Sequence, residues 1–261
     1  MQSKNYTDIN SKTIDSWVEG GWEWGAPITH ETFLNAKNGR WDLLLTPLKP
    51  VPKEWFLPFL KNNSLADAKL LGLASGGGQQ MPVFAALGAS CTILDNSDKQ
   101  LEQERMVSER EAYTLEIVKA DMTKPLPFPP GIFDLIFHPV SNCYVEDVYH
   151  VWNECFRMLK PGGLLLAGMD NGINYLFDDS DPLRVVNKLP FNPLKNPELY
   201  KKSLENKDGI QFSHTLEEQI GGQLKTGFIL TDLYEDYDNC GGIGEYYPPF
   251  IATRAIKPNE P

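Results

Sequence analysis

The sequence predicts an α/β fold with a doubly wound, mostly parallel sheet of Rossmann-like type. From Lys69 onward, short apolar runs alternate with amphipathic segments, and the first apolar run leads directly into the cluster Gly76–Gly78. Strands that alternate with helices require crossover connections, which give parallel strands with helices on both faces. The chain has 261 residues, 41% of them hydrophobic and 23% charged, which fits one such domain with additions.

Each element of this domain has its own local signal. Buried strands are short apolar runs, and helices show the period of 3.6 residues with stops at glycine or proline. We expect strands at 69–73, 90–95, 114–121, 133–138, 163–170, 228–236 and 248–257, the last of them antiparallel in a seven-stranded sheet. Helices are expected at 80–88, 96–113, 146–160 and 214–228, with Ser97 or Asn96 capping the second and Pro161 ending the third.

Two segments fall outside this rhythm. Residues 1–65 hold five of the six tryptophans among helical signals and breakers, and we interpret them as an aromatic-rich N-terminal helical cap on a main domain of residues 66–261. Residues 170–213 are too long for a plain connection, so we expect an inserted lid or substrate-facing segment.

Composition excludes several classes of function. The formal net charge is -11 and no cluster of Lys and Arg is found, which opposes nucleic acid as a partner. The N-terminus lacks the features of a signal peptide, and no apolar run is long enough to span a membrane. The four cysteines are scattered without metal-ligand spacing, so we expect reduced thiols, a cytoplasmic location and no metal site.

The glycine cluster and two acids predict a nucleotide-like ligand. Glycine lets the backbone approach a ligand closely, and the following helix offers free N–H groups. Asp95 ends the second strand, where an acid can bind two ribose hydroxyls, although it could instead cap the next helix. Asp121 follows the third strand, where it could accept from an adenine amino group or simply form an Asx turn.

Two rival ligands are disfavoured by the loop. A triphosphate loop needs a lysine after its last glycine, and none is near Gly78. A dinucleotide fingerprint needs a third small residue, and Met81 stands at that position. An NAD(P)-dependent oxidoreductase is thus disfavoured but stays open as an alternative function. A non-catalytic binding module is a second alternative.

Four landmarks in order show that the sequence resembles the class I S-adenosylmethionine-dependent methyltransferases, in particular the small-molecule group. They are LLGLASGGGQQ, the acid in TILDNSD, the acid in VKADM, and FDLIFHPVSN followed by RMLKPGGLLLAG. The resemblance covers about residues 69–169 and implies S-adenosylmethionine as cofactor and methyl transfer to a small-molecule acceptor by in-line displacement. Two positions depart from the family pattern: Gly72 replaces the usual acid, and Ala74 replaces the first glycine.

The resemblance also implies roles for individual residues. The methionine part of the cofactor would lie along the glycine loop, the ribose at the second strand end and the adenine at the third, with the methyl group beside the fourth strand end. The implied cofactor-binding residues are Ala74, Ser75, Gly76, Gly78, Asp95, Asn96, Asp121, Met122 and His138.

The acceptor side is predicted less sharply. His138 is the first candidate for a general base because its pKa lies near neutrality, and its alternative is a structural role at the turn before Pro139. Tyr144 is the second catalytic candidate, and with Asn142 it could orient a nucleophile by hydrogen bonding. Trp22 and Trp24 flank a glycine-rich bend and are expected to close over the substrate, unless they only pack the cap onto the sheet.

Overall fold

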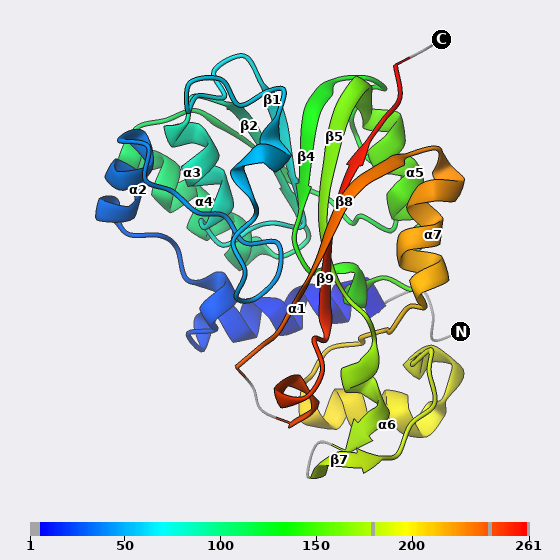
Figure 1. The fold of residues 1–261 in the computed structure, drawn as a ribbon. Helices are drawn as coiled ribbons and strands as arrows, with labels where there is room; N and C mark the ends of the chain where they lie inside the picture. Colours follow the sequence, from blue (N-terminus) through cyan, green and yellow to red (C-terminus); the bar gives the residue numbers. More distant parts are fainter. Residues whose placement is uncertain (1–5, 179–180, 240–241, 260–261) are drawn as a thin grey trace.

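A seven-stranded sheet forms the centre of the molecule, in the order β3-β2-β1-β4-β5-β9-β8 (Figure 1). The computed structural model describes residues 6–178, 181–239 and 242–259. Strands β3, β2, β1, β4 and β5 pair in parallel, whereas β9 is antiparallel to both β5 and β8. This confirms the predicted doubly wound sheet with an antiparallel last strand.

The elements follow the predicted alternation closely. The strands of the large sheet are β1 (Lys69–Leu73), β2 (Ser90–Asp95), β3 (Leu115–Lys119), β4 (Phe133–His138), β5 (Leu159–Asp170), β8 (Ile229–Asp236) and β9 (Phe250–Ile256). The α-helices are α1 (Tyr6–Glu19), α2 (His30–Lys37), α3 (Gln80–Ala86), α4 (Asp98–Glu111), α5 (Val148–Met158), α6 (Pro197–Asn206) and α7 (Leu216–Thr226). Single 3-10 turns and the small hairpin of β6 (Phe177–Asp178) and β7 (Asp181–Val185) complete the chain.

Side chains of the central strands alternate between two hydrophobic cores, one on each face of the sheet. Leu70 belongs to the core that contains α3, and its neighbour Leu71 belongs to the core that contains α5. The same alternation separates Leu164 from Leu165 on β5. Both faces are covered because a parallel sheet needs helices on each side. Figure 1 shows α2, α3 and α4 on one side and α5 and α7 on the other.

Capping residues end the helices where the sequence indicates. The Ser97 side chain accepts from the Gln100 N–H and so begins α4, as predicted. Gly227 ends α7 in the left-handed conformation. One boundary differs from the prediction: β5 begins at Leu159, before the Lys160–Gly163 turn, because Leu159 pairs with Phe133 ahead of a register shift.

The N-terminal segment shares the main core. Trp41 and Trp55 are buried in the same cluster as Leu70 and Phe137, so these two tryptophans pack against the sheet. Within residues 170–213 the structure places the β6–β7 hairpin and α6, which the sequence pattern did not predict. In Figure 1 both lie below the sheet, beyond α1, at the end where the parallel strands finish.

Candidate functional site

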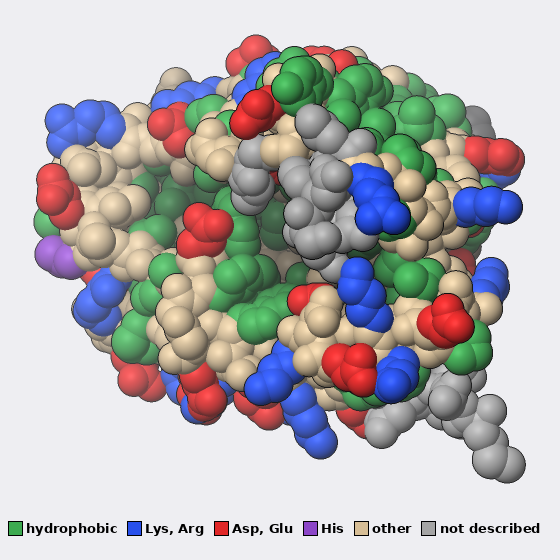
Figure 2. Space-filling model, turned by 90° about the horizontal axis from the view of Figure 1, so that it is seen from below, with side chains coloured by type: hydrophobic (Ala, Val, Ile, Leu, Met, Phe, Trp, Pro, Cys, Tyr) green, Lys and Arg blue, Asp and Glu red, His purple; other side chains and the backbone are tan. Residues whose placement is uncertain are grey.

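A cavity of about 280 Å³ lies at the C-terminal ends of the parallel strands. Its walls come from the loops after β1, β2, β3 and β4, from α1, and from residues 44–47 and Phe250. In an open parallel sheet this edge is where ligands bind, beside the point where the strand order reverses. Seen from this end, hydrophobic side chains gather in a hollow of the surface (Figure 2).

The glycine loop lines the cavity in a conformation that few residues adopt. Ala74 has φ of +48°, a left-handed value that explains why glycine is the usual residue there. Gly76 has no room for a side chain, because a Cβ atom would lie 2.6 Å from the Gln100 Cβ and 3.0 Å from the Asp95 Oδ2. Ala74, Ser75 and Gly76 all line the cavity, and contact of this loop with a ligand stays a prediction.

Packing accounts for Gly72, the position of the missing acid. A Cβ atom there would lie 2.7 Å from Met81 Cε and 3.1 Å from Ile93 Cδ1. The Met81 side chain thus fills the space that a side chain at this position would need. The polar groups next along the loop are Ser75 and Gln80, which are both buried, line the cavity and are hydrogen-bonded to each other at 3.2 Å.

Asp95 lies at the end of β2 and lines the cavity with 8% of its surface exposed. Its Oδ2 accepts from Gly76 N at 3.1 Å and its Oδ1 from Ser97 N at 2.9 Å. Burial raises the pKa of Asp95, and these backbone bonds oppose that shift. Each carboxylate oxygen can accept a second hydrogen bond, so the carboxylate can still bind the two hydroxyls of a ribose.

Asp121 and Met122 line the cavity at the end of β3. Oδ1 of Asp121 accepts from Thr123 N at 2.8 Å, which is the Asx turn that the sequence left as an alternative. The turn occupies one oxygen and leaves Oδ2 for a ligand. Met122 is 8% exposed and offers an apolar surface beside it.

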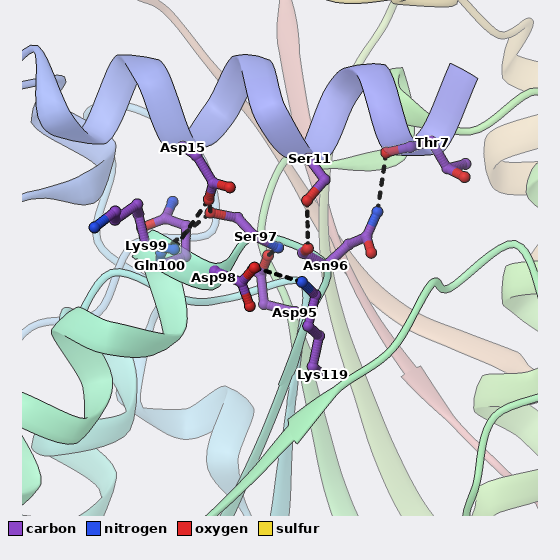
Figure 3. A network of polar contacts seen from close by, with 10 residues as sticks. All are labelled: Thr7, Ser11, Asp15, Asp95, Asn96, Ser97, Asp98, Lys99, Gln100 and Lys119. Carbon is purple, nitrogen blue, oxygen red and sulfur yellow. Dashed lines mark hydrogen bonds and ion pairs between the residues drawn. The ribbon is translucent and has the colours of Figure 1, made fainter. Parts of the chain in front are cut away.

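Helix α1 closes the cavity over the β2–α4 loop (Figure 3). Ser11 Oγ donates to Asn96 O at 2.7 Å, and Asn96 Nδ2 donates to Thr7 O at 3.0 Å. Asp15 Oδ1 accepts from Ser97 Oγ at 2.6 Å and from Lys99 N at 2.9 Å, at the N-terminus of α4. The predicted cofactor residue Asn96 thus lines the cavity and also fastens the helix above it.

Trp22 and Trp24 both line the cavity and are partly exposed. The Trp22 ring lies 5.2 Å from the Trp17 ring, and Trp24 O accepts from Gln100 Nε2 at 3.3 Å. These contacts hold the glycine-rich bend against α1 and α4. Both rings therefore lie at the cavity wall, and substrate binding by them stays a prediction.

Tyr144 also lines the cavity, together with Val140, Cys143 and Phe250. Burial raises the pKa of Tyr144 well above that of an ordinary tyrosine. Its hydroxyl therefore keeps its proton at neutral pH and can donate a hydrogen bond to an acceptor molecule. A role in orienting a nucleophile fits this hydroxyl better than a role as a base.

The predicted catalytic role of His138 is corrected by its environment. The ring is fully buried, is not part of the cavity wall, and bonds at both nitrogens: Nδ1 with Leu73 O and Nε2 with Asn142 Oδ1, each at 2.9 Å. Burial lowers its pKa, so the ring is neutral and donates from Nδ1. His138 joins β4 to β1 and has no free nitrogen for a substrate or cofactor.

Asn142 and Gly78 are also corrected, because neither forms part of the cavity wall. Asn142 is fully buried between His138 and Gln219, to which its Nδ2 donates at 2.9 Å. Gly78 N donates to Glu104 Oε1 at 2.9 Å, and a Cβ atom at Gly78 would lie 2.9 Å from Val107 Cγ2. This glycine allows the loop to pack on α4 rather than to contact a ligand.

Sequence reasoning missed residues that burial alone reveals. Gln80 and Thr46 line the cavity, and Asp170 lies at the end of β5 with a buried carboxylate. The available signal for Asp170 was its place at a strand end, the same signal that identified Asp95. Thr46 had no signal, because it belongs to an irregular segment that only tertiary folding brings to the sheet edge.

The described residues hold neither a membrane-spanning helix nor a cluster of potential metal ligands. No helix there is long and apolar enough to cross a membrane, and no group of three or more potential metal ligands is found. Cys91, Cys143 and Cys155 are free and buried, whereas Cys240 lies outside the described residues. The cytoplasmic location stays a prediction.

Comparisons with known proteins agree with this geometry. Residues 71–167 match the family described as Methyltransferase domain. A Bacillus subtilis protein named Uncharacterized methyltransferase YbaJ is 43% identical over 256 residues, covering 95% of this chain and 97% of that protein. Cycloartenol-C-24-methyltransferase from Arabidopsis thaliana is 30% identical over 169 residues, 62% of this chain and 47% of that protein.

Solved structures show the same fold at low sequence identity. An S-adenosylmethionine-dependent methyltransferase from Mesorhizobium loti matches with a TM-score of 0.59 at 20% identity, covering 78% of this chain and 94% of that one. A putative sarcosine dimethylglycine methyltransferase from Galdieria sulphuraria matches with a TM-score of 0.56 at 13% identity, covering 87% and 97%. With its sheet order, its cavity at the strand ends and a full-length methyltransferase relative, the chain belongs to the class I S-adenosylmethionine-dependent methyltransferases.

Proposed function

We propose that this enzyme methylates a small molecule that enters the cavity above the sheet edge. One observation supports this most directly: the same cavity is lined by the acids that follow β2 and β3 and by Val140, Tyr144 and Phe250. Cofactor and acceptor would therefore share one enclosed space. The sterol methyltransferases among the relatives act on small molecules by their names, which supports the same class of acceptor.

The residues of the cavity fit S-adenosylmethionine. Asp95 would hold the ribose hydroxyls, Asp121 and Met122 would contact the adenine, and the backbone from Ala74 to Gly76 would lie beneath the methionine part. Because Met81 occupies the space beside Gly72, we infer that Ser75 and Gln80 supply the polar contacts that the usual acid would make. When bound, S-adenosylmethionine supplies an electrophilic methyl group on a sulfonium.

The other residues would align the acceptor and exclude water. Helix α1, Trp22 and Trp24 cover the cavity, and closure of this kind strengthens the electrostatic contacts inside it. Tyr144 would donate to the acceptor and orient its nucleophilic atom, since positioning is the main contribution of the protein to an in-line displacement. His138 would keep the β4 end in place without touching either reactant.

Labelling with radioactive S-adenosylmethionine tests the class of acceptor. The protein is incubated with a bacterial extract that has been separated into small molecules, protein and nucleic acid. We expect label in the small-molecule fraction, and loss of that label with Asp95→Asn. Label in the protein or nucleic-acid fraction would show that the acceptor is a macromolecule, and no label in any fraction would also contradict the proposal.

Calorimetry with S-adenosylhomocysteine tests the cofactor site separately. Asp95→Asn should weaken binding at least about tenfold, because a charge-assisted hydrogen bond contributes about 1.5–3 kcal/mol. Asp98→Asn is the matched control: Asp98 is three residues away, pairs with Lys119 at 2.6 Å and does not line the cavity. Equal affinity of both variants for S-adenosylhomocysteine would show that Asp95 does not bind the ribose.

A further inference from the structure

The cavity extends along the sheet edge beyond the residues that would hold the cofactor. Asp95 ends β2, whereas Val140 lies in the loop after β4 and Phe250 begins β9, which are two and four strands away from β2. Neighbouring strands are about 4.8 Å apart, so β9 lies roughly 19 Å from β2 across the sheet. We call the part of the cavity that is lined by residues 44–47, 139–145 and Phe250 the acceptor end.

Residues 44–47 are fixed to the sheet by backbone contacts. Leu45 O accepts from Val140 N at 3.2 Å, and it lies so close to Gly168 on β5 that a Cβ atom there would clash with it. The N–H groups of the next two residues after 47 both donate to Asp236 Oδ2 at 2.8 Å. This side of the acceptor end is therefore preformed, as binding pockets for small molecules usually are.

Apolar side chains of the acceptor end are open to a ligand. Leu44, Pro47, Val140 and Phe250 all line the cavity, and all four are partly exposed. A molecule in the cavity can therefore contact them directly. Covering such surface is favourable for an apolar ligand, because both partners lose contact with water.

The polar side chains of the acceptor end are uncharged. They are Thr46, Ser141, Cys143 and Tyr144. Burial raises the pKa of Cys143 and of Tyr144 well above the ordinary values, so both keep their protons at neutral pH. The Ser141 and Thr46 hydroxyls already donate within the protein, at 3.0 and 3.4 Å, which favours Tyr144 as the donor to a ligand.

A charged acceptor would find no counter-charge from the protein at this end. Among the described residues that line the whole cavity, none is Lys, Arg or His, and the acids are Asp95 and Asp121, which follow β2 and β3. A buried phosphate or carboxylate needs a cation or several donors, and the acceptor end offers no cation and few donors. A cationic acceptor would lie beside the sulfonium of bound S-adenosylmethionine, and like charges repel strongly in a buried site.

We propose that the methyl acceptor is an uncharged molecule with an apolar body. The body packs on Leu44, Val140 and Phe250, and a polar atom of the acceptor accepts from the Tyr144 hydroxyl. This inference rests on the proposed function, because it assumes a small-molecule acceptor in this cavity. It adds the charge and polarity of that acceptor, and it assigns Phe250 and Val140 to substrate binding.

Calorimetry with probes of similar shape and different charge tests the proposal. The probes are 2-phenylethanol, 2-phenylethylamine and phenylacetate, and then butanol, butylamine and butyrate, each titrated at neutral pH into the protein saturated with S-adenosylhomocysteine. In at least one set we expect the neutral probe to bind at least about tenfold more tightly than either charged probe, because an unpaired charge is costly to bury.

Variants of the apolar side chains test the location of the acceptor. Phe250→Ala should weaken binding of the neutral probe severalfold, because apolar contact area is lost. Val140→Thr, which changes the shape of the side chain little, should weaken it as well. Tyr246→Ala is the matched control, because it removes an exposed ring that does not line the cavity, and it should leave binding unchanged. All three variants should bind S-adenosylhomocysteine within about twofold of the wild-type protein, which shows that they are folded.

The outcomes separate this proposal from the broader one. If the wild-type protein does not bind S-adenosylhomocysteine, the proposed cofactor site itself is wrong. If it binds S-adenosylhomocysteine and no neutral probe shows the tenfold preference in either set, absence of binding included, the acceptor is not of the uncharged, apolar class. If the preference is found but Phe250→Ala and Val140→Thr both bind the neutral probe as Tyr246→Ala does, the acceptor does not lie on these side chains.

Discussion

Removing the charge of Asp170 should stabilise the protein, and the gain should depend on pH. The carboxylate is 6% exposed, and its Oδ2 has no hydrogen-bond partner among the described residues. Burial raises its folded-state pKa to about 6, compared with about 3.9 in an unfolded chain. The folded state therefore binds the proton more tightly, and the stability of the wild-type protein falls as pH rises from about 4 through about 6.

The size of this effect follows from the shift. The pKa shift is about two units, and each unit corresponds to about 1.4 kcal/mol. The free energy of unfolding is therefore lower by about 3 kcal/mol when the carboxylate is ionised. Part of the cost is already present at pH 4, because the unfolded residue is half ionised there. The advantage of Asp170→Asn over wild type should therefore grow by about 2 to 3 kcal/mol between about pH 4 and pH 8. Asn keeps the oxygen that accepts from Gly172 N, so the turn after β5 is retained.

Urea unfolding at steps of one pH unit measures this difference directly. The free energies of unfolding of wild type, Asp170→Asn and the control Asp67→Asn are compared at each pH. The control removes one negative charge from an exposed position, in a chain whose net charge is already -11. A pH-independent difference for Asp170→Asn, or an advantage that shrinks toward pH 8, would refute the reasoning from burial.

Three further predictions concern the loop and the helix around the cavity. Gly72→Asp should lower the free energy of unfolding by about 2 kcal/mol or more, because Met81 fills the space beside it; addition of Met81→Ala should recover part of the loss, and a fully stable Gly72→Asp protein would contradict the packing argument. Burial raises the pKa of Glu104 to about 8, so Glu104→Gln should have a higher free energy of unfolding than wild type, and this difference should keep growing up to about pH 8 rather than about pH 6 as for Asp170. A difference that stops growing near pH 6 would show that Glu104 is not buried as described. Asp15→Ala removes two hydrogen bonds that hold α1 to α4 and should speed dissociation of S-adenosylhomocysteine severalfold in stopped-flow measurements. Asp8→Ala, on the exposed side of α1, is the control. Equal dissociation rates in the two variants would mean that α1 does not limit release.

The meeting of the predicted cofactor-binding residues at one cavity could be foreseen because their signals are local. Each acid follows a short apolar run, and parallel strands bring their C-terminal ends to one edge whatever the rest of the chain does. Asp95, Asp121 and Met122 therefore all line the cavity, together with Ala74, Ser75 and Gly76. The N-cap at Ser97 and the end of α7 at Gly227 could likewise be predicted from the few residues around each.

The roles of His138 and Asp170 were not readable in this way. Both end neighbouring strands, and by sequence His138 was the better candidate for chemistry. The structure uses both His138 nitrogens for Leu73 and Asn142, which lie far apart in the sequence. It leaves one Asp170 oxygen without a hydrogen-bond partner within the described part of the chain. Whether a polar side chain is satisfied depends on every group packed around it, so no local pattern reports it.

By itself, the sequence determined the order of the main strands and helices, since periodicity acts over a few residues, and its resemblance to a known family gave the class of cofactor. Only the tertiary structure decided which of those residues are free to react. It showed that Met81 accounts for the glycine at position 72, that α1 closes the cavity, and that the Asp170 carboxylate is buried. Each of these depends on burial and on contacts between distant segments, and these are properties of the packed chain rather than of any stretch of it.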